Sequence, residues 1–230
     1  MRFSFITLFP QIMESYFCDS ILKRAVESGL ISYDFINPRD FSKDKFLKVD
    51  SYQIGGGAGL LLEPNSISSA LESIKQDSKE AHIIFLTPCA KVFNQNDAKR
   101  LSKRSHIVLV CGRYEGFDER LIELYANEVF SIGDFILTGG ELGALCLCDS
   151  ISRQIKGVLG NAESLSGESY ENYLLEAPNF VKPYNFKGLK VPQVYSSGNH
   201  AKLTKLKQKA ATAKTKFHRP DMYKAYKQSK

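Results

Sequence analysis

Apolar runs alternate with amphipathic stretches along the first 160 residues. Five runs predict strands, namely residues 2–9, 30–36, 82–86, 106–110 and 129–137. Continuous apolar strands of this kind are typical of a parallel sheet that is buried on both faces. Apolar residues at helical spacing predict the intervening helices, over residues 11–28, 63–74 and 94–105, from 118 onward, and over 141–155. The alternation of strand and helix predicts an α/β fold with a mostly parallel sheet.

Three of the predicted strands run into turns that are rich in glycine or proline. Their sequences are LTPC, VCGRYEG and IGDFILTGGELG, within the ranges 86–89, 110–116 and 132–143. Parallel strands present their carboxyl ends at one edge of a sheet, and ligands bind in the crevice beyond that edge. We therefore expect the three turns to meet and to hold an adenosine-like ligand through backbone groups. A Rossmann dinucleotide site needs a glycine fingerprint after the first strand, which here ends in Phe9 and Pro10.

A separate glycine cluster, GGGAG, occupies residues 55–59. It lacks the G-K-[ST] of a phosphate-binding loop and the G-x-G-x-x-G spacing of a dinucleotide site. Glycines in such a cluster allow the backbone to approach a ligand or a partner surface closely. The pattern points to function without naming the ligand.

The last third of the chain changes character. Residues 164–173 are polar and read as a linker, and three prolines then interrupt an irregular stretch. A lysine-rich helix is predicted over roughly residues 200–216, and a short final helix after Pro220. The resulting division is an α/β domain over 1–160, a linker over 161–176 and a small, basic, mainly helical domain over 177–230.

Charge is distributed very unevenly along the chain. The net charge is +6, yet residues 181–230 hold thirteen Lys and Arg against one acid, Asp221, while the other 180 residues carry a net −6. Basic residues gathered at one end are the electrostatic footprint of a polyanion-binding segment. The alternative is a solvated lysine-rich tail, but the apolar and aromatic residues among the lysines favour a folded segment.

Several classes of site and location are disfavoured by the sequence. No apolar run approaches the roughly 18 residues that span a bilayer, so we expect no membrane association. The four histidines are scattered, and His82 and His106 open apolar strands, where structural roles are commoner. Five cysteines without a C-x-x-C pair predict reduced thiols in a cytoplasmic protein, with Cys111 and Cys146 inside apolar runs.

A set of motifs makes the chain resemble a known family. The segments PRDF, GGGAG, FLTP, LVCGRYEGFDER, SIGDFILTGGEL, DSISR, GVLGN and SSGNHA occur in this order. They resemble the bacterial tRNA (guanine-N1)-methyltransferases, collinearly over nearly the whole chain. The long motifs GRYEGxDER and SIGDFxLTGGE carry most of the specificity.

The resemblance implies properties that periodicity and composition do not show. The family has a knotted, SPOUT-type α/β domain with a deep trefoil knot, which binds S-adenosylmethionine. It acts as a homodimer whose active sites are formed by both subunits. It methylates N1 of the guanine immediately 3′ of the anticodon in tRNA, and its basic C-terminal domain contacts the tRNA through the anticodon arm. A cytoplasmic enzyme is thus expected, and the need for a divalent cation stays open.

The resemblance also implies which residues hold the cofactor. They are Thr87, Pro88, Gly112, Glu115, Ile132, Gly133, Asp134, Phe135, Ile136, Leu137, Gly139 and Gly140. Glycines let the backbone come close to the adenosine, and Glu115 is suited to hold a charged amine of the cofactor. Without the resemblance, Glu115 is equally well explained as an acid near the start of a helix.

The chemistry sets requirements for two further residues. Guanine N1 is a poor nucleophile until its proton leaves, so a positioned base is needed, and a cation should stabilise the negative charge that then builds on the purine. By resemblance Arg153 is the cation, although its spacing from Asp149 alone favours an ordinary ion pair. The family's base is an aspartate, and the matching position here is Glu168, which adds a methylene. Gly143 is a second departure, where the motif often has proline.

Two alternatives stay open on the sequence. A non-catalytic RNA-binding homologue is favoured by one feature, the glutamate at position 168. A knotted methyltransferase that acts on another RNA is the other. The sequence predicts no metal ligands in either case.

Overall fold

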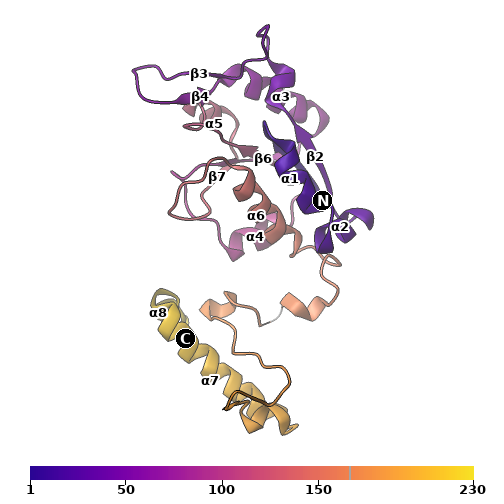
Figure 1. Ribbon diagram of the computed structural model, residues 1–230, viewed down its shortest axis with the longest axis vertical. Helices are drawn as coiled ribbons and strands as arrows, with labels where there is room; N and C mark the ends of the chain where they lie inside the picture. The colour runs from indigo at the N-terminus through magenta and orange to yellow at the C-terminus, as the bar shows by residue number, and fades with distance from the viewer. Residues whose placement is uncertain (166) are drawn as a thin grey trace. The chain divides into compact units, whose positions relative to one another are not determined.

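The computed structural model describes residues 1–165 and 167–230 (Figure 1). Ser166, which falls in the predicted linker 161–176, lies outside the described residues. The chain divides into two compact units, residues 1–162 and residues 163–230. Each unit is built around its own buried residues and is described by itself below.

The first unit is organised around a five-stranded sheet. Its strands are β1 (Arg2–Ile6), β2 (Ser32–Ile36), β5 (His82–Leu86), β6 (His106–Cys111) and β7 (Glu128–Phe130). They lie in the order β2-β1-β6-β5-β7, and every neighbouring pair is parallel. The prediction of an α/β fold with a mostly parallel sheet is therefore confirmed.

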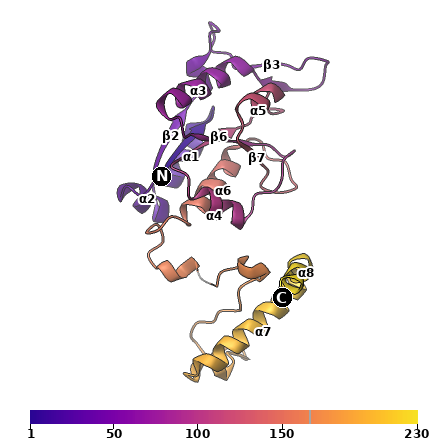
Figure 2. The same cartoon turned by 180° about the vertical axis from the view of Figure 1, so that it is seen from behind.

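Helices cover both faces of the sheet (Figures 1 and 2). One face is covered by α1 (Pro10–Glu14), α2 (Ser20–Glu27), α4 (Gln95–Leu101) and α6 (Glu141–Ser152), and the other by α3 (Pro64–Asp77) and α5 (Glu119–Tyr125). Side chains of β6 alternate between the two cores, with Ile107 and Leu109 in the first and Val108 and Val110 in the second. The apolar runs of the sequence are continuous because these strands are buried on both sides.

Side-chain caps fix where several helices begin. The Glu63 carboxylate accepts the amide of Ser66 at the start of α3, and Asp118 caps α5 through the amide of Arg120. Asn94 and Asp97 form a reciprocal capping box at α4. Each cap satisfies amides that have no partner within the helix, so these boundaries are encoded locally.

Several predicted elements are longer than the observed ones: the strand predicted over 2–9 ends at Ile6, and the helix predicted over 94–105 ends at Leu101. Two others differ more. Residues 11–28 are not one helix, because the chain forms α1, then η1 (Ser15–Phe17), and restarts at α2. Asp19 is extended there and caps α2, and Ser20 has a φ of 60°. The predicted strand over residues 129–137 ends at Phe130, and the following residues, with Gly133 at a φ of 157°, form an irregular segment.

A small hairpin and a 3₁₀ turn complete the first unit. Strands β3 (Asp50–Tyr52) and β4 (Leu60–Leu62) are antiparallel, and the glycine cluster 55–59 connects them. The 3₁₀ helix η2 (Pro38–Phe41) packs against α3. The sequence predicted neither strand of this hairpin.

The second unit is a small helical assembly with a single short hairpin. Its elements are η4 (Glu171–Tyr173), β8 (Asn185–Phe186), β9 (Leu189–Lys190), η5 (Gln193–Ser196), α7 (His200–His218) and α8 (Pro220–Gln228), after η3 (Ala162–Leu165) at the junction of the units. The two predicted helices are confirmed as α7 and α8. The buried residues of this unit include Leu174, Ala211, Thr215 and Tyr226.

The helices of both units differ from membrane-spanning segments. None of those within residues 1–165 and 167–230 has the length and apolar character that crossing a bilayer requires.

Candidate active site

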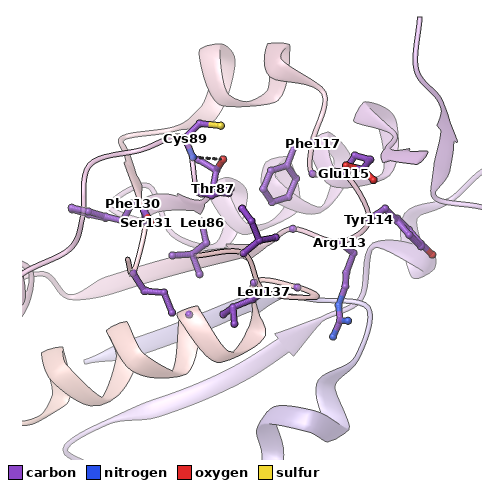
Figure 3. Close-up of a pocket in the computed structure, with 18 of the residues that line it drawn as sticks. Leu86, Thr87, Cys89, Arg113, Tyr114, Glu115, Phe117, Phe130, Ser131 and Leu137 are labelled. Carbon is purple, nitrogen blue, oxygen red and sulfur yellow. Dashed lines mark hydrogen bonds between the residues drawn. The ribbon is translucent and has the colours of Figure 1, made fainter. Parts of the chain in front are cut away.

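A cavity of about 240 Å³ lies beyond the carboxyl ends of β5, β6 and β7 (Figure 3). Leu86 from the end of β5, Gly112 after β6 and Phe130 from the end of β7 all line it. This is the edge at which ligands bind in parallel α/β sheets. The three turns expected to converge therefore meet at one cavity.

Most of the candidate cofactor residues line this cavity. They are Thr87, Pro88, Gly112, Glu115, Ile132, Phe135, Ile136, Leu137, Gly139 and Gly140. Gly133 and Asp134 belong to the same segment as Ile132 but are not among the lining residues. Figure 3 shows Thr87, Phe117 and Leu137 facing a common space from three different turns.

The segment after β7 folds back against the turn that follows β6. The amide of Gly140 donates to the carbonyl of Gly112 at 2.8 Å, and Gly139 forms an antiparallel bridge with Arg113. A Cβ atom on Gly140 would lie 2.8 Å from both the Cα of Cys111 and the amide nitrogen of Gly112. Only glycine allows the two backbones to come this close, so the approach shapes one wall of the cavity.

Glu141, the first residue of α6, joins these segments to Thr7, the residue that follows β1. Its side chain is 2% exposed, and its Oε1 accepts hydrogen bonds from the Thr7 hydroxyl at 2.9 Å and from Arg113 Nε at 3.0 Å. The Arg113 guanidinium also lies over the Phe9 ring, 4.4 Å from its centroid. Sequence reasoning did not assign a role to Arg113 or Glu141, although a charged residue inside the TGGE motif was a usable signal.

Glu115 packs against the glycine cluster of the β3–β4 hairpin. Its amide donates to the carbonyl of Leu60 at 3.0 Å. A Cβ on Gly59 would lie 2.6 Å from Glu115 Cγ, so the glycine permits this contact. The neighbouring Tyr114 has a φ of 58°, and burial, together with nearby Asp50, raises its pKa. Gly59 of the glycine cluster thus leaves room for the side chain of Glu115.

The lining combines apolar walls with a few polar groups. Leu86, Phe117, Ile132 and Leu137 supply apolar surface, and the Thr87 hydroxyl accepts the amide of Cys89 at 3.3 Å. Apolar walls suit a planar ring, and the glycine backbone offers amides and carbonyls to its edges. The lining residues therefore fit an adenosine-containing molecule.

Arg153 and Glu168 lie outside the lining of this cavity and belong to different units. Arg153 follows α6 directly, and its amide donates to the carbonyl of Asp149 at 3.0 Å. The carboxylate of Asp149 accepts the Tyr16 hydroxyl, which raises the pKa of Tyr16 to about 12. The structure therefore joins Asp149 to η1, the short 3₁₀ helix that follows α1.

Glu168 lies in a turn of the second unit. Its carbonyl accepts the amide of Glu171 at 3.4 Å, and the Glu171 carboxylate accepts the amide of Gly167 at 3.0 Å. Glu168 also lines a cleft of about 610 Å³ within that unit, beside residues of α7. Within the described parts of the chain, no group of three or more His, Cys, Asp or Glu side chains gathers as a metal site.

Comparison with known proteins shows which family the chain belongs to. The model of the family described as tRNA (Guanine-1)-methyltransferase TrmD matches residues 1–225. The chain belongs to this family.

Relatives of the same name match over nearly their full lengths. A tRNA (guanine-N(1)-)-methyltransferase of Sulfurovum sp. strain NBC37-1 is 59% identical over 97% of this chain and 99% of its own length. Proteins of that name from Helicobacter hepaticus and Campylobacter jejuni are each 58% identical, over 98% and 97% of this chain and 94% and 97% of their own lengths. The resemblance drawn from the motifs is confirmed, and the chain is a methyltransferase of the TrmD family.

Proposed function

We propose that this protein transfers a methyl group from S-adenosylmethionine to N1 of the guanine 3′-adjacent to the anticodon in tRNA. The observation that carries the proposal is the glycine-lined cavity, whose walls come from the motifs GRYEGFDER and SIGDFILTGGEL of a TrmD-family chain. Whole-length similarity to relatives named tRNA (guanine-N(1)-)-methyltransferase supports the substrate class.

The cavity is the proposed cofactor site. S-adenosylmethionine supplies a methyl group activated by its sulfonium. Backbone groups of Ile132, Gly139 and Gly140 and the residues Thr87 and Pro88 hold the adenosine, and Glu115 holds the amine. Gly133 and Asp134 act by shaping the segment that bears Ile132. Phe135, Ile136 and Leu137 shield the methyl donor from water when the site closes.

A trefoil knot is part of the proposal. In a knot, residues 131–140 and the turn after β6 would lie against each other. The two segments are hydrogen-bonded here, from the amide of Gly140 to the carbonyl of Gly112. The backbone of Gly140 packs closely against that of Cys111 and Gly112, which only glycine allows. This close packing supports a fixed, preorganised cofactor site.

Glu168 and Arg153 are the proposed catalytic pair. The Glu168 carboxylate removes the proton from guanine N1, which frees the lone pair that attacks the methyl group. The Arg153 guanidinium stabilises the negative charge that builds on the purine oxygen. Glutamate reaches one methylene further than aspartate, so the backbone that carries Glu168 must be placed accordingly.

We further propose a homodimer with shared active sites. Helices α1 and α6 pack together, and each carries an exposed apolar side chain, Ile12 at 48% and Leu142 at 54% exposed. Covering these side chains with a second copy buries apolar surface that is costly to leave in water. In such a dimer the cavity of one subunit pairs with residues of the other.

The basic second unit is the proposed contact for the tRNA anticodon arm. Twelve lysines and Arg219 within residues 181–230 are suited to phosphates, which position the RNA without reading its sequence. We assign residues 1–160 to the methyltransferase domain, 161–176 to the linker and 177–230 to the tRNA-binding domain of a cytoplasmic enzyme.

Methylation of tRNA transcripts tests the proposal. Transcripts with guanine 3′ of the anticodon should be labelled at that base, and transcripts with adenine there should not. Equal labelling of both would refute the substrate assignment and favour another RNA. Parallel reactions with Mg²⁺ and with EDTA determine whether a divalent cation assists.

Glu168→Gln tests the base, with Glu176→Gln as the control from the same segment. We expect Glu168→Gln to lower kcat by about 100-fold or more, because a general base contributes 10²–10⁴-fold, while Glu176→Gln retains activity. Wild type that binds cofactor and tRNA yet forms no methylguanine would establish the binding-only alternative, which the glutamate at position 168 favours.

A further inference from the structure

Thr215 is an unusual residue for the helix that contains it. Helix α7 is lysine-rich and mostly exposed, yet Thr215 is 0% exposed. Its hydroxyl donates to the carbonyl of Ala211 at 2.7 Å and accepts the amide of Leu175 at 2.8 Å. The first bond stays within α7, whereas the second crosses to a segment 40 residues earlier. A buried hydroxyl used in both directions connects two elements.

The segment that Thr215 holds is the turn that carries Glu168. We define the Glu168 turn as residues 167–176. It is closed by hydrogen bonds of its own, from the Tyr170 amide to the Leu174 carbonyl at 2.7 Å and from the Glu176 amide to the Ser169 hydroxyl at 3.1 Å. Leu174 is buried and lines one cleft with Ala211 and Tyr226. The turn is therefore a closed loop fixed to α7 at its far end.

The backbone of this turn is strained. Tyr170, Asn172 and Tyr173 have φ values of 80°, 49° and 59°, in the left-handed region that L-residues rarely adopt. Such residues persist only where the surrounding structure holds them, and they cluster at functional sites. Three of them within four residues need an external anchor, and the bond to Thr215 supplies one.

We propose that Thr215 is a positioning residue for the methyl transfer, which holds the Glu168 turn on α7 so that the carboxylate is presented in one place. The inference rests on the proposed role of Glu168 as the base. In this arrangement α7 both carries the lysines for the tRNA and fixes the base. Binding of the RNA to α7 thereby sets the position of the group that deprotonates the guanine.

Substitutions at Thr215 test the inference in the full-length protein. Thr215→Val keeps the shape and removes the hydroxyl, and Thr215→Ser restores it. Thr212→Val is the matched control, because the Thr212 hydroxyl donates to the Gln208 carbonyl at 2.8 Å in the same intrahelical pattern. We expect kcat of Thr215→Val to fall on the order of tenfold, since small misplacements of a catalytic group can cost up to about 100-fold.

The split between kcat and KM separates positioning from general damage. The KM for S-adenosylmethionine should be unchanged in Thr215→Val, because the cavity lies in the other unit. Thr215→Ser and Thr212→Val should retain wild-type kcat. A Thr215→Val enzyme with the same kcat as Thr212→Val would overturn the inference, as would a Thr215→Ser enzyme as slow as Thr215→Val.

Amide hydrogen exchange provides a readout that does not depend on turnover. Exchange over residues 167–176 should be faster in Thr215→Val and unchanged in Thr212→Val. Equal exchange in all variants would overturn the anchoring. A fully active Glu168→Gln variant would instead refute the base, and this failure is distinguishable because exchange reports the anchor alone.

Discussion

Arg113 Nε donates a hydrogen bond to Glu141 Oε1 at 3.0 Å, and Arg113 Nη2 lies 2.9 Å from Glu141 Oε2. The pair joins the turn after β6 to the first residue of α6, where the chain has just folded back over that turn. The hydroxyl of Thr7, the residue that follows β1, donates to the same carboxylate. Three segments that border or support the cavity are thus held by one buried carboxylate.

Removing the charge of Glu141 should destabilise the first unit. Glu141→Gln leaves the largely buried Arg113 guanidinium without its counter-ion, and we expect a loss of about 2–3 kcal/mol in the free energy of unfolding. Urea unfolding measures it. Glu119→Gln, at the first residue of α5 and exposed, is the control. Equal unfolding midpoints for the two variants would contradict the buried pair.

Gly140→Ala should weaken cofactor binding. The added Cβ would lie 2.8 Å from the backbone of Cys111 and Gly112, so one wall of the cavity must move. Overpacking of this kind costs about 1–3 kcal/mol, and we expect roughly a tenfold or greater loss of affinity for S-adenosylmethionine. Calorimetric titration measures the affinity. Gly160→Ala, with nothing within 4 Å, should bind normally, and an unchanged Gly140→Ala would argue against a tight crossing.

Strands β5 and β6 were predictable because burial on both faces leaves a continuous apolar run in the sequence. The turns after them were also predictable, because glycine and proline mark the ends of such runs. The break at Asp19 was not, because the apolar periodicity continues through it. Asp19 ends one helical segment and caps the next without any glycine or proline.

The segment after β7 shows why tertiary structure overrides local pattern. Residues 135–137 are apolar like a strand, yet Ile136 is 79% exposed and no strand forms there. Its path is set by contacts with the turn after β6, which local sequence does not encode. Likewise Glu141 bonds to Arg113 and Thr7, 28 and 134 residues away. Cys146 was expected in the core but is exposed, whereas Cys148 is buried.

Cofactor should protect Cys89 from alkylation. The Cys89 thiol is exposed and its residue lines the cavity, while Cys18 is exposed elsewhere. Burial raises the pKa of the thiols of Cys111 and Cys148, so both should stay unreactive in the native protein. Mass spectrometry after brief iodoacetamide treatment measures each site. S-adenosylmethionine should slow the reaction at Cys89 and leave that at Cys18 unchanged; equal slowing at both would point away from this cavity.

Binding of tRNA should depend steeply on salt. Each phosphate contact contributes about −0.7 to −0.9 to the slope of log K against log salt. Replacing Lys202, Lys205 and Lys209, all exposed on α7, by Gln should therefore flatten the slope by roughly 2 to 3. The triple variant Lys43→Gln, Lys79→Gln and Lys103→Gln, at exposed sites of the first unit, controls for net charge. Filter binding over a salt series measures the slope, and a flat response in wild type would show that the lysines are only a solvated face.

Acid should destabilise the first unit through His106. The imidazole is buried, its Nε2 lies 2.8 Å from the Ser4 hydroxyl, and that hydroxyl donates to Asp34 at 2.6 Å. Nε2 must then donate, so a second proton has to enter at Nδ1, which has no hydrogen-bond partner among the described residues. Burial, reinforced by the charge of Arg2, lowers the pKa of His106 below its usual 6.5.

Because the folded state holds His106 neutral, the unfolded state binds more protons as the pH falls below 6.5. The contribution of neutral His106 to the free energy of unfolding is therefore fully present above that pH. It declines as the pH falls toward the folded-state pKa. The lowered pKa values of Glu63 and Asp118 act only below their usual 4.5 and 3.8, outside this window. Urea unfolding at steps between about pH 7.5 and about pH 5 measures the decline.

His106→Gln keeps a donor at the position of Nε2 and cannot titrate. We expect it to be less dependent on pH than wild type across this window, whereas His200→Gln, at an exposed site, should follow wild type. If His106→Gln loses stability as steeply as wild type between these pH values, another group must carry the acid sensitivity. The measurement thus separates the histidine at the start of β6 from the carboxylates of the first unit.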